Sequence, residues 1–226
     1  MYWIAKKDYD VVMITETKTS MKKRFRGFLP VVIDIETAGF HAKTDAVLEI
    51  AAVMLDINDA NQLVPKETHF YHVEPFKSAH IDPKALEFNK IDPFHPFRFA
   101  ESEKATLEAL FTAVRAEMKL HGCGRAVLVG HNPNFDLGFL QAATTRAEAT
   151  TKDPFHQFTT FDTATLAGVA LGQTVLIKAC EAAKIPFDVK EAHSAKYDAE
   201  RTAELFCYIV NRFHNATHPA VYTHHT

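Results

Sequence analysis

Asp34 and Glu36 are two carboxylates inside an otherwise apolar run, Val31 to Glu36, that is typical of a buried β-strand. Residues two apart in a strand point to the same face, so we expect these side chains to lie close together. Carboxylates at this spacing repel each other and lose hydration unless a cation lies between them. Oxygen ligands of this kind favour hard ions such as Mg²⁺ or Mn²⁺. The alternative is a strand end that merely reaches solvent, which Gly39 soon afterwards allows.

Asp136 ends the segment His131-Asn132-Pro133-Asn134-Phe135-Asp136, which follows an apolar run at 126–129 and opens a helical pattern. Asp136 is therefore expected near the carboxyl edge of a sheet, where open α/β folds place their sites. The alternative is that Asn134 caps the helix while Asp136 occupies its favourable first turn. Both interpretations can hold at once.

His193 and Asp198 form a third candidate pair at the start of the last helical pattern. Five residues on a helix correspond to a rotation of about 140° between the two side chains. His193 therefore suits a loop that folds over the site, with Asp198 fixed on the helix below it. Histidine titrates near neutral pH, as a general base that activates water requires.

The apolar patterns around these residues predict an α/β fold with a mixed β-sheet flanked by helices. Predicted strands are 31–36, 47–57, 69–73 and 126–129, and a further strand and helix start are expected within 161–166. Predicted helices are 101–120, 134–146, 175–183 and 194–213. Residues 74–100 are rich in proline and phenylalanine and are expected to form a long connection with one helical turn. Such long connections are usually functional.

Length, charge and cysteine usage narrow the class of protein. The 226 residues fit one domain. A net charge of −3 excludes a basic field over the whole domain, so phosphate must be held by a local patch or by bound metal. The apolar runs are too short to span a bilayer, and residues 1–20 hold no continuous signal-peptide core. Three cysteines without a CxxC pair favour reduced thiols and a cytoplasmic location, with no membrane partner.

The three blocks that carry these residues together resemble the DEDDh exonuclease superfamily. Ser194 stands where the sister subgroup has a tyrosine, so the chain is similar to the histidine subgroup. Within it, residues 24–213 resemble the ribonuclease T family. The strings that carry this second resemblance are RFRGF at 24–28, the run at 31–40, VEPF at 73–76, FDTA at 161–164 and ALGQTVL at 170–176.

The resemblance implies a ribonuclease H-like fold and a 3′→5′ exoribonuclease that releases nucleoside 5′-monophosphates. It implies that Asp34 bridges two Mg²⁺ ions, which Mn²⁺ can replace, and that Glu36 and Asp198 complete the water-activating site. Asp136 then holds the second ion, and His193 takes the proton of the attacking water. It also divides the chain into an N-terminal extension at 1–23, an exonuclease domain at 24–214 and a C-terminal tail at 215–226.

The resemblance further implies substrate contacts and a homodimer. Four phenylalanines match family positions that stack on bases at the substrate end: Phe40, Phe88, Phe135 and Phe158. For any single phenylalanine among the 18 in the chain, core packing is the alternative. A basic patch that holds phosphates for the neighbouring subunit's active site matches Arg24, Arg26, Lys119 and Arg125. Lys84 departs from the family pattern, in which a substrate-contacting glutamate is expected, and leaves the terminal-base preference open.

Three hypotheses follow. The leading one is an exoribonuclease that trims single-stranded 3′ ends of tRNA and other stable RNAs. The second is a single-stranded DNA 3′ exonuclease in repair or proofreading. The third is a non-catalytic RNA-binding module, against which the intact set of five site residues argues.

Overall fold

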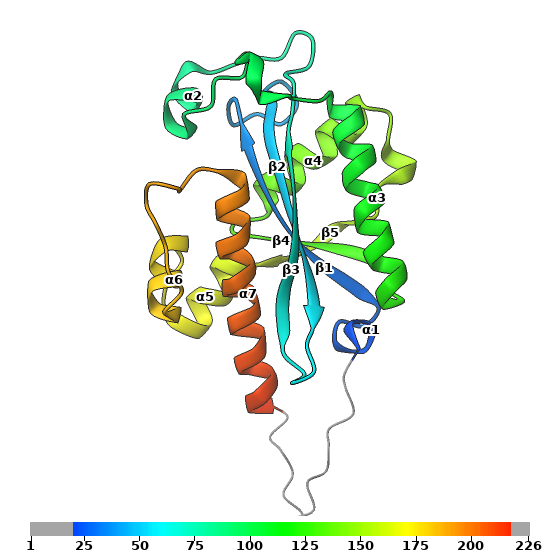
Figure 1. Ribbon diagram of the computed structural model, residues 1–226, viewed down its shortest axis with the longest axis vertical. Helices are drawn as coiled ribbons and strands as arrows, with labels where there is room; N and C mark the ends of the chain where they lie inside the picture. The colour runs from blue at the N-terminus through cyan, green and yellow to red at the C-terminus, as the bar shows by residue number, and fades with distance from the viewer. Residues whose placement is uncertain (1–19, 218–226) are drawn as a thin grey trace, which may run out of the picture.

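The computed structural model describes residues 20–217, which form a five-stranded sheet in the order β3-β2-β1-β4-β5 (Figure 1). The strands are β1 (Phe28–Thr37), β2 (Val47–Ile57), β3 (Leu63–His72), β4 (Arg125–Gly130) and β5 (Phe155–Asp162). β1, β2 and β3 pair antiparallel, whereas β1 pairs parallel with β4 and β4 with β5. The predicted mixed sheet is confirmed.

Helices cover both faces of this sheet (Figure 1). The long α7 (Ala195–Thr217) packs on β3, β2 and β1, and α3 (Glu103–His121) and α4 (Asn134–Arg146) pack on the other side. The helices α5 (Thr163–Leu171) and α6 (Leu176–Ala183) pack beside α7. Two short helices lie at opposite ends of the sheet, α1 (Met21–Arg24) and α2 (Pro83–Asn89). The 3₁₀ turns η1 (Pro96–Arg98) and η2 (Thr150–Lys152) complete the described elements.

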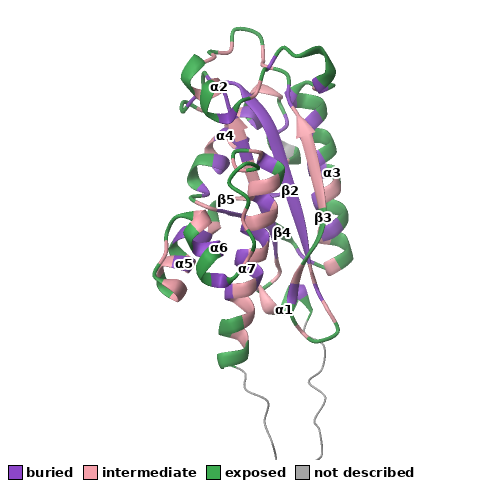
Figure 2. Cartoon of the chain, turned by 60° about the vertical axis from the view of Figure 1, so that its left-hand side comes forward, coloured by how far each residue is buried: buried purple, intermediate pink, exposed green. Residues whose placement is uncertain are grey.

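The central strands are buried because helices cover both of their faces (Figure 2). Every residue of β2 is buried except Asp56. In β1, residues 29–37 are buried except Asp34 and Glu36. The only charged residues of β1 are thus Asp34 and Glu36.

The largest departures from the predicted bounds are the starts of the two edge strands. β3 begins at Leu63 and β5 at Phe155, several residues before the predicted starts. Their added residues are largely exposed or half-buried and carry polar side chains, so they lack the apolar alternation of a covered strand. In the 74–100 connection, Asp82 caps α2 by accepting a hydrogen bond from Lys84 N–H, and Pro83 occupies the first helical position.

The packed structure begins within the range expected to be an extension. Met21 in α1 is only 1% exposed and belongs to the main core. At the other end, α7 runs through residue 217. Residues 1–19 and 218–226 lie outside the described part of the chain.

Within residues 20–217, no single helix is long and apolar enough to cross a membrane. The bent pair α5 and α6 meets that test together, by length and composition alone.

Candidate active site

The carboxyl end of β1 extends beyond the end of its pairing with the parallel strand β4, and this leaves a gap in the sheet. β1 pairs with β4 only as far as Val32 and Val129, whereas its pairing with β2 continues to Thr37. The N–H of Ile35 therefore has no partner strand on the β4 side. Asp136 fills the gap, because its Oδ1 accepts the Ile35 N–H at 3.0 Å.

Asp136 reaches this position from the first turn of α4, where it is 5% exposed. The residue that precedes α4 is Pro133, and no side chain caps the helix. The alternative that Asn134 is the helix cap is therefore wrong. The hydrogen bond to β1 accounts for the position of Asp136, which lies beside Asp34 and Glu36 in one pocket.

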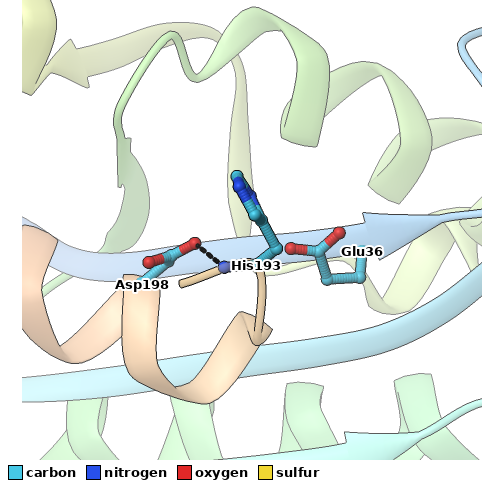
Figure 3. A group of neighbouring side chains, drawn as sticks. All are labelled: Glu36, His193 and Asp198. Carbon is cyan, nitrogen blue, oxygen red and sulfur yellow. Dashed lines mark hydrogen bonds between the residues drawn. The ribbon is translucent and has the colours of Figure 1, made fainter. Parts of the chain in front are cut away.

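His193 and Asp198 come from the turn before α7 and from its first turn. His193 adopts the left-handed region with φ of 69°, and its backbone N–H donates to Asp198 Oδ2 at 3.0 Å. This bond folds the loop back over the helix start, as the sequence spacing predicted. Figure 3 shows His193 between the carboxylates of Glu36 and Asp198, with its backbone bonded to Asp198. Each offers a ligand atom, and these atoms all lie within 4.8 Å of one another.

The carboxylates strongly disfavour one another's charge. Burial raises the pKa of Asp34 well above its usual range, and the neighbouring Asp136 and Glu36 raise it further. Burial together with Asp198 and other acids raises the pKa of Glu36 to about 8. Burial raises the pKa of Asp136 to about 7, although its backbone hydrogen bonds oppose that shift. Burial also raises the pKa of Asp198, against the lowering effect of its bond to His193 N–H. A group that must ionise here needs a cation close by.

These residues line one pocket of about 700 Å³ at the carboxyl end of β1. Exposed aromatic rings stand around its opening. Phe40 is 78% exposed and lies edge-on to Phe135, with ring centroids 6.3 Å apart. Phe88, from α2, contacts the His193 ring with centroids 4.1 Å apart. Lys84 also lines the pocket.

Core packing explains only one of these phenylalanines. Phe135 is 38% exposed and packs on the buried Phe139, with centroids 4.9 Å apart. Phe40 and Phe88 are mostly exposed, so neither is held in place by the core. One of the three rings at the pocket is therefore packed on the core, and the other two are exposed to solvent.

Phe158 is not brought to this pocket. It is 83% exposed on β5 and lines a separate hollow of about 360 Å³ with polar side chains from α4.

The predicted basic residues lie at the opposite end of the sheet, where β1 and β4 begin (Figure 1). Arg26 precedes β1 and Arg125 opens β4, and a hydrogen bond of 2.9 Å from Gly124 N–H to Gly27 C=O joins the two turns. Lys119 lies in the last turn of α3, just before Gly122. Arg26, Lys119 and Arg125 are exposed and share this end of the molecule, and they are called the basic end below.

Arg24 differs from the other three. Its guanidinium donates to Asn61 C=O at 3.0 Å and to Asn211 Oδ1 at 3.2 Å, and burial lowers its pKa. Arg24 therefore ties α1 to the β2–β3 turn and to α7.

Sequence reasoning missed the residues that hold the rim of the pocket. Asn89 Nδ2 donates to Thr37 C=O at 3.0 Å and joins α2 to the end of β1. Asp45, 1% exposed, accepts from His41 N–H, pairs with His80 and lies in the space that a side chain on Gly39 would fill. These contacts fix the loop that carries Phe40 and the helix that carries Phe88. Their residues are far apart in sequence, so no local pattern marks them.

Comparisons with known proteins agree with this geometry. Residues 31–206 match the sequence model of the family described as Exonuclease, RNase_T. The chain is 56% identical over 196 residues to ribonuclease T of Hahella chejuensis (strain KCTC 2396), covering 87% of this chain and 89% of that protein.

Solved structures share the fold. E. coli exonuclease I in complex with a dT13 oligonucleotide has a TM-score of 0.63 at 18% identity, over 83% of this chain and 42% of that one. The zinc-bound form of an E. coli exonuclease I complex with single-stranded DNA has a TM-score of 0.60 at 20% identity, over 81% of this chain and 40% of that one. The chain thus spans about two fifths of these exonuclease I chains, and the likeness concerns the fold alone.

Proposed function

This chain belongs to the exonuclease family and is a 3′→5′ exoribonuclease, and we propose that it trims single-stranded 3′ ends of tRNA and other stable RNAs. The products are nucleoside 5′-monophosphates, released one at a time. One observation carries this proposal. Four carboxylates and a histidine converge in a pocket whose opening is lined by exposed aromatic rings.

The carboxylates fit divalent metal ions, on which enzymes of this family depend. Asp198 Oδ1 is buried and has no hydrogen-bond partner among residues 20–217, and burial and the neighbouring acids raise the pKa values of Asp34 and Glu36, an effect that a bound cation would offset. We propose two Mg²⁺ ions, which Mn²⁺ can replace, held by Asp34, Glu36, Asp136 and Asp198. When bound, such ions lower the pKa of water and stabilise the negative charge that develops on the phosphate.

We infer that His193 acts as the general base. Its ring lies above Glu36 and Asp198 at the mouth of the pocket, and its backbone bond to Asp198 fixes the loop that carries it (Figure 3). As the water oxygen attacks phosphorus, His193 takes the water proton, and the 3′ oxygen of the preceding nucleotide leaves with the bond electrons. The His193 ring also contacts the Phe88 ring, with centroids 4.1 Å apart.

The exposed rings bind the terminal nucleotides by stacking. Phe40 and Phe88 lie on different segments around the same opening, and the Phe135 ring contacts the Phe40 ring edge-on. Base stacking on aromatic side chains contributes about 1–3 kcal/mol per base and tolerates different bases. The enzyme therefore accepts varied 3′ ends, with Lys84 in the pocket as a candidate determinant of base preference.

A homodimer accounts for the position of the basic end. β1 has ten residues, which span roughly 30 Å at 3.3 Å each, and the basic end lies at the start of that strand. Arg26, Lys119 and Arg125 therefore lie too far from their own pocket to hold the phosphates next to the scissile bond. In a two-fold dimer, each basic end serves the pocket of the neighbouring subunit. Phe158, exposed on the edge strand β5 outside the pocket, is proposed as a further substrate contact.

Single-stranded DNA is the second candidate substrate. The fold is shared with exonuclease I, which has been solved in complex with dT13. Matched RNA and DNA duplexes with identical 3′ overhangs, incubated with Mg²⁺ and resolved at single-nucleotide steps, separate the two. Stepwise shortening of the RNA overhang that stops near the duplex, and is faster than for DNA, supports the proposal. Faster shortening of the DNA overhang supports the alternative, and no shortening of either contradicts both.

A further inference from the structure

Glu49 is a buried carboxylate beside the active site that no step of the mechanism uses. It lies on β2 directly opposite Glu36 on β1 and opposite His72 on β3. The three side chains therefore form a row across the strands, on the face that α7 covers. Glu49 is 8% exposed.

A carboxylate at this position is unfavourable unless it makes compensating contacts. Like charges directly opposite each other destabilise a sheet, and burial removes the water that would screen them. Glu49 also adds to the negative charge around Asp34 and Glu36. Contacts that an apolar side chain could not make must therefore offset this cost.

Its two oxygens contact two different elements. Glu49 Oε2 accepts the backbone N–H of Ala195 at 3.4 Å, and Oε1 lies 3.3 Å from His72 Nδ1. Ala195 is the first residue of α7, and its N–H has no carbonyl partner within the helix. Glu49 thus joins the start of α7 to the centre of the sheet.

The start of α7 carries two residues of the proposed active site. His193 lies two residues before Ala195, and Asp198 lies in the first turn after it. We infer that Glu49 is a positioning residue, whose oxygen holds the first turn of α7 so that Asp198 and His193 face Glu36. This inference rests on the proposed function. It assigns to Glu49 an acceptor role, which does not require a negative charge.

Two substitutions of Glu49 distinguish the effect of its acceptor oxygen from the effect of its negative charge. Glu49→Gln keeps the shape and an acceptor oxygen but removes the charge. Glu49→Met keeps the length and removes the acceptor, which leaves the Ala195 N–H without its partner. We expect kcat on a single-stranded RNA to stay within about threefold of wild type for Glu49→Gln. For Glu49→Met we expect a fall of about 10–100-fold, with KM within about threefold.

The Mg²⁺ concentration for half-maximal activity and the melting temperature complete the test. A positioning role through the acceptor leaves the Mg²⁺ requirement of Glu49→Gln unchanged. Equal loss in both variants, or a tenfold higher Mg²⁺ requirement for Glu49→Gln, would show that the charge binds metal and would overturn the inference. Full activity in both variants would overturn it as well. Wild type and Asp34→Asn are measured in parallel, because inactive wild type would contradict the proposed function and not this role.

Discussion

The two ends of β1 have opposite chemistry. Its carboxyl end holds a recessed cluster of acids, in which Asp34 and Glu36 resist ionisation. Its amino end is bordered by the exposed cations Arg26, Lys119 and Arg125. One end is suited to cutting a phosphodiester and repels phosphate unless cations are bound. The other is suited to attracting phosphate.

This separation explains how a chain with a net charge of −3 can act on a polyanion. The attraction is local at both ends, through bound metal at the pocket and through arginine and lysine at the basic end. Under the proposed function, both ends are required. The experiments below change one end at a time, beginning with the acidic end, where the expected effects are largest.

Removing the charge of Asp34 should abolish cleavage. Metal ions supply several kcal/mol of transition-state stabilisation, and 1.4 kcal/mol corresponds to tenfold in rate. Asp34→Asn should therefore lower kcat by about 10³-fold or more. Asp56→Asn, a change of the same type near the far end of β2, should leave kcat within about twofold. Substantial Mg²⁺-dependent activity of Asp34→Asn would show that the cluster is not the metal site.

Removing the imidazole of His193 should slow the chemical step and leave RNA binding nearly unchanged. His193→Ala should reduce turnover by about 10²–10⁴-fold while the Kd for single-stranded RNA changes little. Single-turnover rates and binding curves on the same oligonucleotide check this. If Kd rises instead and the single-turnover rate of bound substrate is unchanged, His193 is a substrate contact.

The acidic cluster should make stability depend on pH and on metal. The pKa of Glu36 is raised from 4.5 to about 8 in the folded protein. Below pH 4.5 the carboxyl is protonated in both the folded and the unfolded state, so Glu36 does not reduce stability there. Between pH 4.5 and 8 the unfolded chain ionises while the folded one keeps its proton, so stability falls as pH rises.

In a chelator, we therefore expect a Tm lower by roughly 5–10 °C at pH 8 than at pH 5. Mg²⁺ binds the ionised cluster of the folded protein and should restore most of this loss at pH 8. Glu36→Gln should flatten the pH dependence, whereas Glu108→Gln on the exposed face of α3 should not. A Mg²⁺ effect that is equal at both pH values would argue against binding at these acids.

The rim of the pocket should affect binding more than stability. Phe40→Ala should weaken binding of single-stranded RNA by about 1–3 kcal/mol for the lost stack. Because Phe40 is 78% exposed, its removal should leave the Tm nearly unchanged. Phe213→Ala, which truncates an exposed ring on α7, is the matched control. A lower Tm with unchanged RNA affinity would assign Phe40 to packing.

The sequence predicted the acidic end much better than the rest of the pocket. Asp34 and Glu36 were recognisable because carboxylates interrupt a buried strand, and the loop position of His193 followed from helical geometry. Glu49 is also a carboxylate in a buried strand, but it has no acidic neighbour two residues away to mark it. The role of Asp45 depends on its contact with His80, which only the folded chain creates.

The starts of β3 and β5 were missed for a related reason. Edge strands are exposed on one side, so their polar residues carry no periodic apolar signal. The basic end was named from resemblance, because nothing in the spacing of Arg26, Lys119 and Arg125 brings them together. The structure brings them together at the start of two parallel strands, and it shows that Arg24 is engaged inside the protein.

The smallest expected effect concerns the basic end. Arg26→Ala combined with Arg125→Ala removes two phosphate contacts and leaves Arg24 and its internal bonds intact. Each contact contributes a slope of about 0.7 in the dependence of log Kd on log salt for a single strand. The slope should therefore fall by about 1.4, so a fourfold rise in salt should weaken the variant about sevenfold less than wild type. Asp56→Asn should keep the wild-type slope.

Mixing subunits then shows which pocket the basic end serves. One parent carries Arg26→Ala and Arg125→Ala, and the other carries Asp34→Asn. If the basic end acts across the dimer, a heterodimer contains one pocket that can bind metal and that faces an intact basic end. Random exchange of equal amounts makes half of the dimers mixed, so about a quarter of the wild-type sites should work. Assayed at a salt concentration where both parents are nearly inactive, the mixture should exceed the sum of the parents. If verified heterodimers show no such gain, the basic end and the pocket it serves lie in the same subunit. The two ends of β1 would then act on one RNA strand that bends along the molecule.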